Sequence, residues 1–196
     1  CGSRAIYASN LGSVSSISDP SQLFINKNVI NNNNNTGVEI FVGNVNLDIR
    51  ITNNTIINNT SSDAAGGVKL TMGGASPAAS AYITNNIIAG NTGYEEGGMY
   101  LQYWTFSLVS IKNNSFYNNY STQTESGSAI RTLRYDTSYG TSVASQIDDN
   151  LFSNHKGNNL VYFDVGNISS YLDINLNDNN YIGNQTDYII YQSGGA

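Results

Sequence analysis

One short pattern of apolar and polar positions recurs six times along the chain, and its clearest copy spans residues 51–59. Each copy begins with an aliphatic residue that is followed three positions later by Asn. The starting residues are Ile25, Ile51, Ile83, Ile111, Ile147 and Leu176. These starts lie 26, 32, 28, 36 and 29 residues apart. A loose period of about 30 residues is typical of solenoids, in which each repeat forms one coil.

Each copy contains two polar anchors, five residues apart, with a large apolar residue between them. The first anchors are Asn28, Asn54, Asn86, Asn114, Asn150 and Asn179. The second anchors are Asn33, Asn59, Asn91, Asn119, His155 and Asn184. The apolar residues between them are Ile30, Ile56, Ile88, Phe116, Phe152 and Tyr181. Asn tolerates the left-handed backbone conformation and can bond along a stack of coils, so we expect the anchors to occupy tight corners and to form two Asn ladders. In this interpretation His155 replaces Asn in a turn.

The segments around the anchors alternate apolar and polar residues, as in residues 47–52 and 68–72. A period of two predicts half-buried strands, and one repeat cannot bury its apolar face alone. The sequence therefore predicts an all-β fold: a right-handed parallel β-helix of about six coils whose ends are uncapped. We expect residues 1–22 to form a strand and a loop that enter the solenoid, residues 23–192 the solenoid, and residues 193–196 a tail.

Two further motifs carry a family resemblance. Residues 116–119 read F-x-x-N, and Gly-Gly or Gly-Ser precedes an apolar strand at residues 66–68, 97–99 and 127–130. Together these motifs resemble the F-x-x-N and G-G-A-I repeats of polymorphic outer-membrane-protein-like and adhesin passengers. More broadly, the chain is similar to the right-handed parallel β-helix, or pectate-lyase-like, superfamily over about residues 3–192. The resemblance implies an extracellular or cell-surface location, but it transfers no activity.

Composition narrows the choice of partners. Only 11% of the 196 residues are charged, the net charge is −6, and the eight Lys and Arg are scattered, which argues against a nucleic-acid partner. The single cysteine, Cys1, excludes an intramolecular disulfide. A chain that begins Cys-Gly-Ser looks like a bacterial lipoprotein after signal cleavage, and a lipid on Cys1 is the only membrane attachment we expect; a fragment start is the alternative. Glycosylation sequons such as those at Asn34 and Asn113 also occur, and loop sites could carry glycans.

Acidic pairs are the first candidates for chemistry. Asp148 and Asp149 are adjacent, as are the catalytic carboxylates of polygalacturonase-like β-helix enzymes. They occupy positions that other copies fill with Thr-Asn or Lys-Asn, and no Gly-His-Gly or Arg-x-Lys segment accompanies them, so a solvated turn is favoured. Glu95 and Glu96 are interpreted as surface charge, with cation binding as the alternative. One His and one Cys provide no zinc spacing. We assign no catalytic residue, metal or cofactor.

Aromatic residues suggest a second type of site. The chain holds 14 Tyr, and Tyr100 and Trp104 would share one face of a strand, where they could stack on a sugar. Core filling or stacking between strands is the favoured interpretation. We therefore expect a non-catalytic structural, adhesive or filament-forming module. Its partners would be further copies joined through the open ends, a polysaccharide or a cell-surface ligand. A carbohydrate-binding or carbohydrate-active protein is the alternative.

Overall fold

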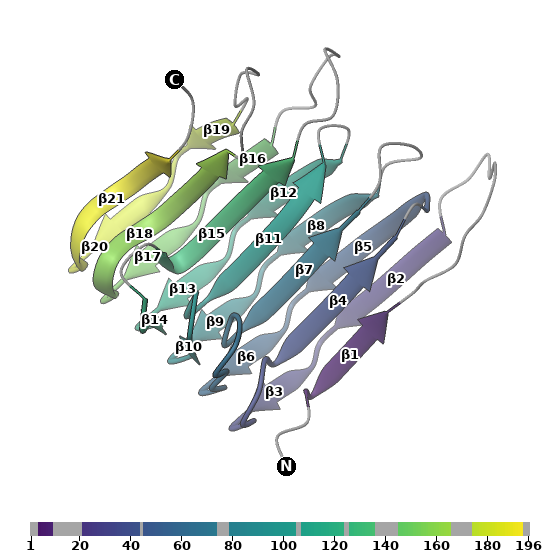
Figure 1. Ribbon diagram of the computed structural model, residues 1–196, viewed down its shortest axis with the longest axis horizontal. Coiled ribbons are helices and arrows are strands. Elements are labelled where there is room, and N and C mark those ends of the chain that lie inside the picture. Colours follow the sequence, from purple (N-terminus) through teal and green to yellow (C-terminus); the bar gives the residue numbers. More distant parts are fainter. Residues whose placement is uncertain are drawn as a thin grey trace.

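The computed structural model describes residues 4–9, 21–43, 45–73, 79–104, 107–123, 126–135, 145–165 and 174–193. Within these ranges there is no helix, and every paired strand is parallel. The strands wind into a solenoid of about five turns (Figure 1). The predicted all-β, parallel β-helix with stacked coils is thus confirmed. The number of turns is slightly below the expected six.

Three sheets form the walls of the solenoid. The first sheet contains seven strands that stack coil upon coil: β1 (Ile6–Ser9), β4 (Val38–Val42), β7 (Val68–Met72), β11 (Met99–Trp104), β15 (Gly127–Tyr135), β18 (Lys156–Val165) and β21 (Gln185–Ser193). Two short strands join it: β10 (Thr92–Gly93) and β14 (Tyr120–Ser121).

The other two sheets contain six strands each. The second is built from β2 (Ser21–Asn26), β5 (Leu47–Thr52), β8 (Ser80–Thr84), β12 (Leu108–Lys112), β16 (Ser145–Asp148) and β19 (Ile174–Asn177). The third is built from β3 (Val29–Asn31), β6 (Thr55–Ile57), β9 (Ile87–Ala89), β13 (Ser115–Tyr117), β17 (Leu151–Ser153) and β20 (Asn180–Ile182).

The corners between the second and third sheets, and between the third and first, each use one residue with a positive φ. The first corner column is Lys27, Asn53, Asn85, Asn113, Asp149 and Asp178, with φ between 53° and 59°. The second is Asn32, Asn58, Gly90, Asn118, Asn154 and Gly183. Each of these residues directly precedes an anchor. Our expectation that the anchors themselves take the left-handed conformation is therefore wrong, and the anchor Asn side chain is free to turn inward along the stack.

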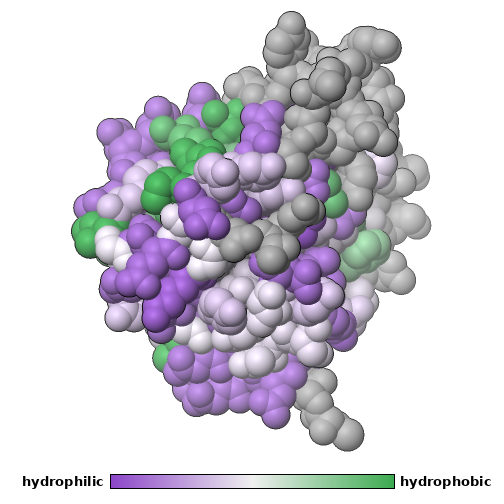
Figure 2. Space-filling view, turned by 60° about the vertical axis from the view of Figure 1, so that its left-hand side comes forward, coloured by the Kyte–Doolittle hydropathy of each residue, from purple (hydrophilic) through white to green (hydrophobic). Residues whose placement is uncertain are grey.

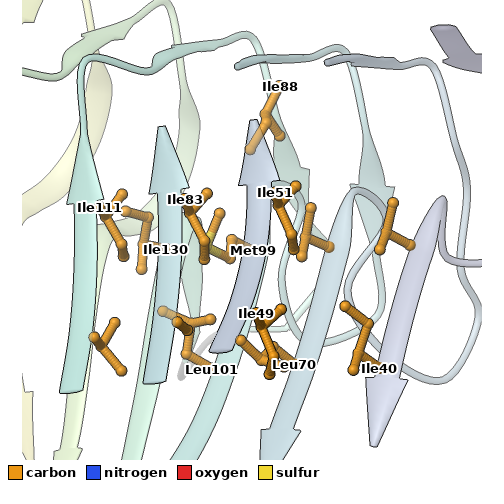
Figure 3. Packing of buried hydrophobic residues seen from close by; sticks show 14 of the residues in the cluster. Ile40, Ile49, Ile51, Leu70, Ile83, Ile88, Met99, Leu101, Ile111 and Ile130 are labelled. Carbon is orange, nitrogen blue, oxygen red and sulfur yellow. The ribbon is translucent and has the colours of Figure 1, made fainter. Parts of the chain in front are cut away.

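The interior is filled by apolar residues that lie directly above one another in successive coils. Ile49, Ile51, Ile83 and Ile111 of the second sheet point toward Ile40, Leu70, Leu101, Met99 and Ile130 of the first (Figure 3). In the third sheet, Ile30, Ile56 and Ile88 give way to Phe116, Phe152 and Tyr181. The rings stack, with centroids 5.1 and 5.3 Å apart, so one column continues from aliphatic to aromatic packing.

The paired glycines ahead of the first sheet have a steric explanation. A Cβ on Gly67 would lie 2.3 Å from the carbonyl oxygen of Gly98, and a Cβ on Gly98 would lie 2.3 Å from that of Ala129. Backbones of successive coils approach one another here more closely than a side chain allows. This close approach accounts for the recurring Gly-Gly motif.

Candidate functional site

The first Asn column forms an unbroken ladder through the whole stack. The Nδ2 of each Asn donates to the Oδ1 of the Asn in the next coil over 3.0–3.1 Å, from Asn28 to Asn179. The same Oδ1 accepts the backbone N–H of the preceding Asn at 2.9–3.0 Å. From Asn54 to Asn179, each Oδ1 thus accepts from two donors of the preceding coil, and the donors all point toward the C-terminal end of the chain.

The second column is a ladder for four coils and is then interrupted. Asn33, Asn59, Asn91 and Asn119 are linked by Nδ2 to Oδ1 bonds of 2.7, 3.0 and 3.1 Å. His155 occupies the next place, and its backbone N–H continues the pattern by donating to Oδ1 of Asn184 over 3.1 Å. Its ring departs from the pattern: Nδ1 lies 3.3 Å from the Asn119 carbonyl oxygen, and the buried Nε2 has no hydrogen-bond partner among the described residues.

The surroundings of His155 keep its ring neutral. The side chain is fully buried, and burial lowers the pKa of the imidazole from 6.5 to about 4, opposed in part by hydrogen bonding to the backbone of Phe116 and of Asn119. A neutral imidazole whose Nδ1–H faces a carbonyl leaves Nε2 as an unused acceptor. His155 therefore takes the place of an Asn in the second column, as predicted.

The outward side of the first sheet carries a charged cluster that sequence reasoning missed. Arg131 Nη1 lies 3.1 Å from Oε1 of Glu96, and its Nη2 lies 3.2 Å from Oδ2 of Asp164. The guanidinium also lies 5.7 Å from the ring centroid of Tyr100 and 5.3 Å from that of Tyr162. Strand register explains the stack, because Tyr100, Arg131 and Tyr162 are direct partners in β11, β15 and β18.

Glu96 is the most perturbed acid in this cluster. Its side chain is fully buried, Oε2 has no partner among the described residues, and burial raises the pKa of the carboxyl from 4.5 to about 8 despite the nearby Arg131. The residue was expected to be surface charge, and that expectation is wrong. Its backbone carbonyl also accepts the N–H of Gly66 from the preceding coil. The Glu96–Arg131 pair therefore ties a loop to the wall of the solenoid.

The same cluster covers one of the two aromatic residues that were predicted to bind a sugar. Tyr100 and Trp104 do lie on the outward face of β11, where they alternate with the buried Leu101 and Tyr103. Tyr100, however, is only 8% exposed, because it packs against Arg131, and its hydroxyl is 3.3 Å from Oε1 of Gln102. A ring must expose a face to stack on a sugar, and Tyr100 does not. Carbohydrate binding by this pair stays a prediction.

The two residues of the acidic pair, Asp148 and Asp149, have different structural roles. Asp148 ends β16, and its Oδ2 lies 3.1 Å from Nζ of Lys112. Its Oδ1 accepts from the backbone N–H and the Nδ2 of Asn177, over 3.2 and 3.3 Å. Asp149 is exposed and takes the left-handed corner position. Asp148 therefore bonds across coils, and Asp149 turns the chain, as predicted for a turn.

The remaining predictions concern metals, membranes and the first residue. No group of three or more His, Cys, Asp or Glu that could hold a metal ion occurs among the described residues. None of the described segments is a helix with the length and apolarity that a membrane crossing requires. Cys1, the proposed lipidation site, lies outside the described residues. Of the sequons, Asn34 and Asn113 are exposed, whereas Asn119 is buried in the second ladder.

The two ends of the solenoid are the most distinctive surfaces that the described residues present. At one end β1, β2 and β3 are the edge strands of the three sheets, and at the other end β21, β19 and β20 are. No described element pairs with their outer edges.

Comparison with protein-family models, with curated proteins and with solved structures finds no match for this chain.

Proposed function

We propose that this protein is a non-catalytic structural module of the cell exterior that joins to further copies of itself through the two open ends of its solenoid. The observation that carries this proposal is the set of unpaired strand edges at each end. Such edges are templates for pairing with another chain, and natural proteins usually shorten, charge or cover them. Among the described residues, β21 is a nine-residue edge strand, and no described segment covers it.

The C-terminal edge also exposes apolar side chains. Ile190 is 44% exposed, although it continues the column of core residues Ile130 and Val161. Ile182 of β20 and Tyr188 of β21 are 52% and 55% exposed. Figure 2, in which this end of the solenoid is turned toward the viewer, shows hydrophobic residues at the surface beside hydrophilic ones. Exposed apolar area of this kind marks an interaction surface.

Several polar groups bond from one coil to the next. The two ladders, Asp148 and the Glu96–Arg131 pair all bond between coils, and this supports a structural role over a catalytic one. The location outside the cell rests on the resemblance of the F-x-x-N and Gly-Gly repeats to those of outer-membrane-protein-like passengers.

Sedimentation velocity and negative-stain electron microscopy over a range of protein concentrations test this proposal. We expect rod-shaped species that lengthen as concentration rises. Ile190→Lys should suppress them, because it places a charge on the edge that must pair. Ile87→Lys is the matched control, since Ile87 is 49% exposed on β9 in the middle of the stack. A strictly monomeric protein at its highest soluble concentration would contradict the proposal.

A further inference from the structure

The three sheets have unequal numbers of stacked strands, and this limits how two copies can join. Without the two-residue strands β10 and β14, the first sheet has seven, from β1 to β21, whereas the second and third have six each. If one copy is stacked on another so that β2 lies on β19 and β3 on β20, both β1 and β21 claim the same place beside β4. One strand must leave before all three sheets can run continuously from copy to copy.

The sequences of β1 and β21 show which exchange the fold permits. The register can be followed from β1 through β4, β7, β11, β15 and β18 to β21. It places Ile6 and Ile190 in one column, Tyr7 and Tyr191 in the next, and Ser9 and Ser193 in the column at the end of β1. β1 reads Ile-Tyr-Ala-Ser, and the last four residues of β21 read Ile-Tyr-Gln-Ser. The two strands thus carry nearly the same residues at equivalent register positions, β1 on the edge of β4 and β21 on the edge of β18.

We propose that β21 of one copy replaces β1 on the edge of β4 in the next copy, so that each joint is made by strand exchange. This inference rests on the proposed function, because it specifies how the two open ends join. β1 is four residues long, whereas β21 has nine, so β21 offers the longer strand. In the unjoined chain β1 occupies the edge of β4 that the partner strand needs.

The ladders give the joint a direction. Within the chain, the backbone N–H of each ladder Asn donates to Oδ1 in the next coil, as from Asn150 to Asn179. Among the described residues, the backbone N–H groups of Asn179 and Asn184 have no acceptor, and Oδ1 of Asn28 and of Asn33 accepts no bond. A second copy stacked head to tail supplies both: Asn179 would donate to Asn28, and Asn184 to Asn33. Such a heterologous contact propagates as an open filament.

Charge at the corner column favours the same arrangement. Five of the six residues in the first corner column are neutral or acidic, and the column begins with Lys27 and ends with Asp149 and Asp178. Lys27 and Asp178 are both exposed. In the proposed joint, Asp178 of one copy lies next to Lys27 of the following copy, which supplies a cation to the acidic end of the column. Exposed pairs of this kind are screened by salt, so the joint should weaken as ionic strength rises.

A hollow at the N-terminal end lies between β1 and β3 and is lined by Ala5, Ile6, Asn28, Ile30 and Asn33, among others. Among the described residues, no strand pairs with β3 on this side. In the joint, β20 of the neighbouring copy occupies this place and sets Tyr181 against Ile30, which continues the stacked column of the third sheet.

Disulfide trapping in a Cys1→Ser background tests the exchange. One sample carries Phe41→Cys on β4 and another carries Ser193→Cys on β21, since Phe41 is the register partner of Ser9, and Ser193 is the equivalent of Ser9 in β21. After mixing and oxidation we expect a mixed disulfide dimer on a non-reducing gel. Gln192→Cys in place of Ser193→Cys is the matched control, because that residue points to the other face of the strand. Equal cross-linking by both variants, or by neither, would overturn the exchange.

A locked variant separates this inference from the proposed function. Ser9→Cys with Phe41→Cys, also in Cys1→Ser, allows a disulfide that holds β1 on β4. We expect the oxidised protein to stay monomeric and the reduced protein to assemble. If the oxidised protein forms the same rods as the unlocked chain, strand exchange is wrong while end-to-end joining stands. If neither the reduced variant nor the unmodified chain assembles, both proposals fail.

Discussion

The two Asn columns differ at one position, and the difference shows what an amide does that an imidazole cannot. In the first column, Asn114 receives two donors on Oδ1 and gives Nδ2 to Asn150. At the equivalent step of the second column, Asn119 faces His155, whose ring offers one contact to a carbonyl and leaves Nε2 unpaired. Stacking identical coils requires a side chain that donates and accepts along the axis, and only the amide does both in this geometry.

The largest loss of stability should come from interrupting the first Asn column, which is continuous through the stack. Asn114→Leu removes the acceptor of two buried donors on Asn86, and buried groups left without partners make the loss about 3 kcal/mol of unfolding free energy. Asn119→Leu also removes the acceptor of two buried donors, on Asn91, but it should cost less because, among the described residues, Asn119 has no side-chain bond to the next coil that could be lost. Urea unfolding monitored by circular dichroism measures both. Asn113→Gly, an exposed corner residue with φ of 56°, is the control and should change little.

The interrupted column should also make stability depend on pH. Because the pKa of His155 is about 4 in the folded protein and 6.5 when unfolded, the unfolded state binds more protons between these values. Folding stability should therefore fall as pH drops from 6.5 to 4, by up to about 3 kcal/mol. Glu96 acts in the opposite sense: its raised pKa makes the folded state lose stability as pH rises from 4.5 to 8.

The difference between the unmodified protein and His155→Asn isolates the histidine, since both contain Glu96. Urea midpoints at pH 4.5 and 7.5 give this difference directly. We expect His155→Asn to exceed the unmodified protein in stability by more at pH 4.5 than at pH 7.5. A difference that is the same at both pH values would show that the imidazole is not held in the dry, neutral state described above.

A smaller gain should follow from repairing the column at neutral pH. His155→Asn supplies an Oδ1 to Asn119 and removes the unpaired Nε2, which should stabilise the fold by about 1 kcal/mol. Thermal unfolding at pH 7.5 measures the gain. His155→Ala, which removes the ring without restoring the ladder, should destabilise the protein; stabilisation by both substitutions would mean that the ring is merely too large for its place.

The smallest effect should come from the corner column. Asp149 is exposed and takes a φ of 57°, and Asn fills the same position at residues 53, 85 and 113. Asp149→Asn should therefore change the unfolding free energy by less than about 0.5 kcal/mol. Differential scanning calorimetry gives the comparison with Asn114→Leu. A large loss of unfolding free energy would show that the corner residues contribute more to stability than this account allows.

Much of this arrangement could be predicted from spacing alone. The recurrent aliphatic residue and the Asn three positions later fix the coil, so Asn54, Asn86 and Asn114 could be assigned to neighbouring coils. The left-handed position could not be distinguished from the anchor, because pairs such as Asn53-Asn54 place the same residue type at both. Gly90 and Gly183, which stand one residue before an anchor, were the available signal.

The outward cluster was beyond sequence reasoning for a different reason. Glu96 and Arg131 are 35 residues apart, and their contact depends on the strand register of β11 and β15 and on the path of the loop before Gly97. A slip of one residue would place either side chain on the opposite face. Periodicity identifies which residues belong to a strand, but it does not determine how a loop folds back across the wall.

Scalar couplings through hydrogen bonds test the central claim most directly, because they detect which donor is bonded to which acceptor in solution. We predict measurable couplings from the backbone ¹⁵N of Asn54 to Cγ of Asn86 and from that of Asn86 to Cγ of Asn114, together with slow exchange of both amide protons. Asn119, which faces His155, should show no coupling of this kind. Absence of the first two couplings, with fast exchange of both amides, would contradict the stacked ladders.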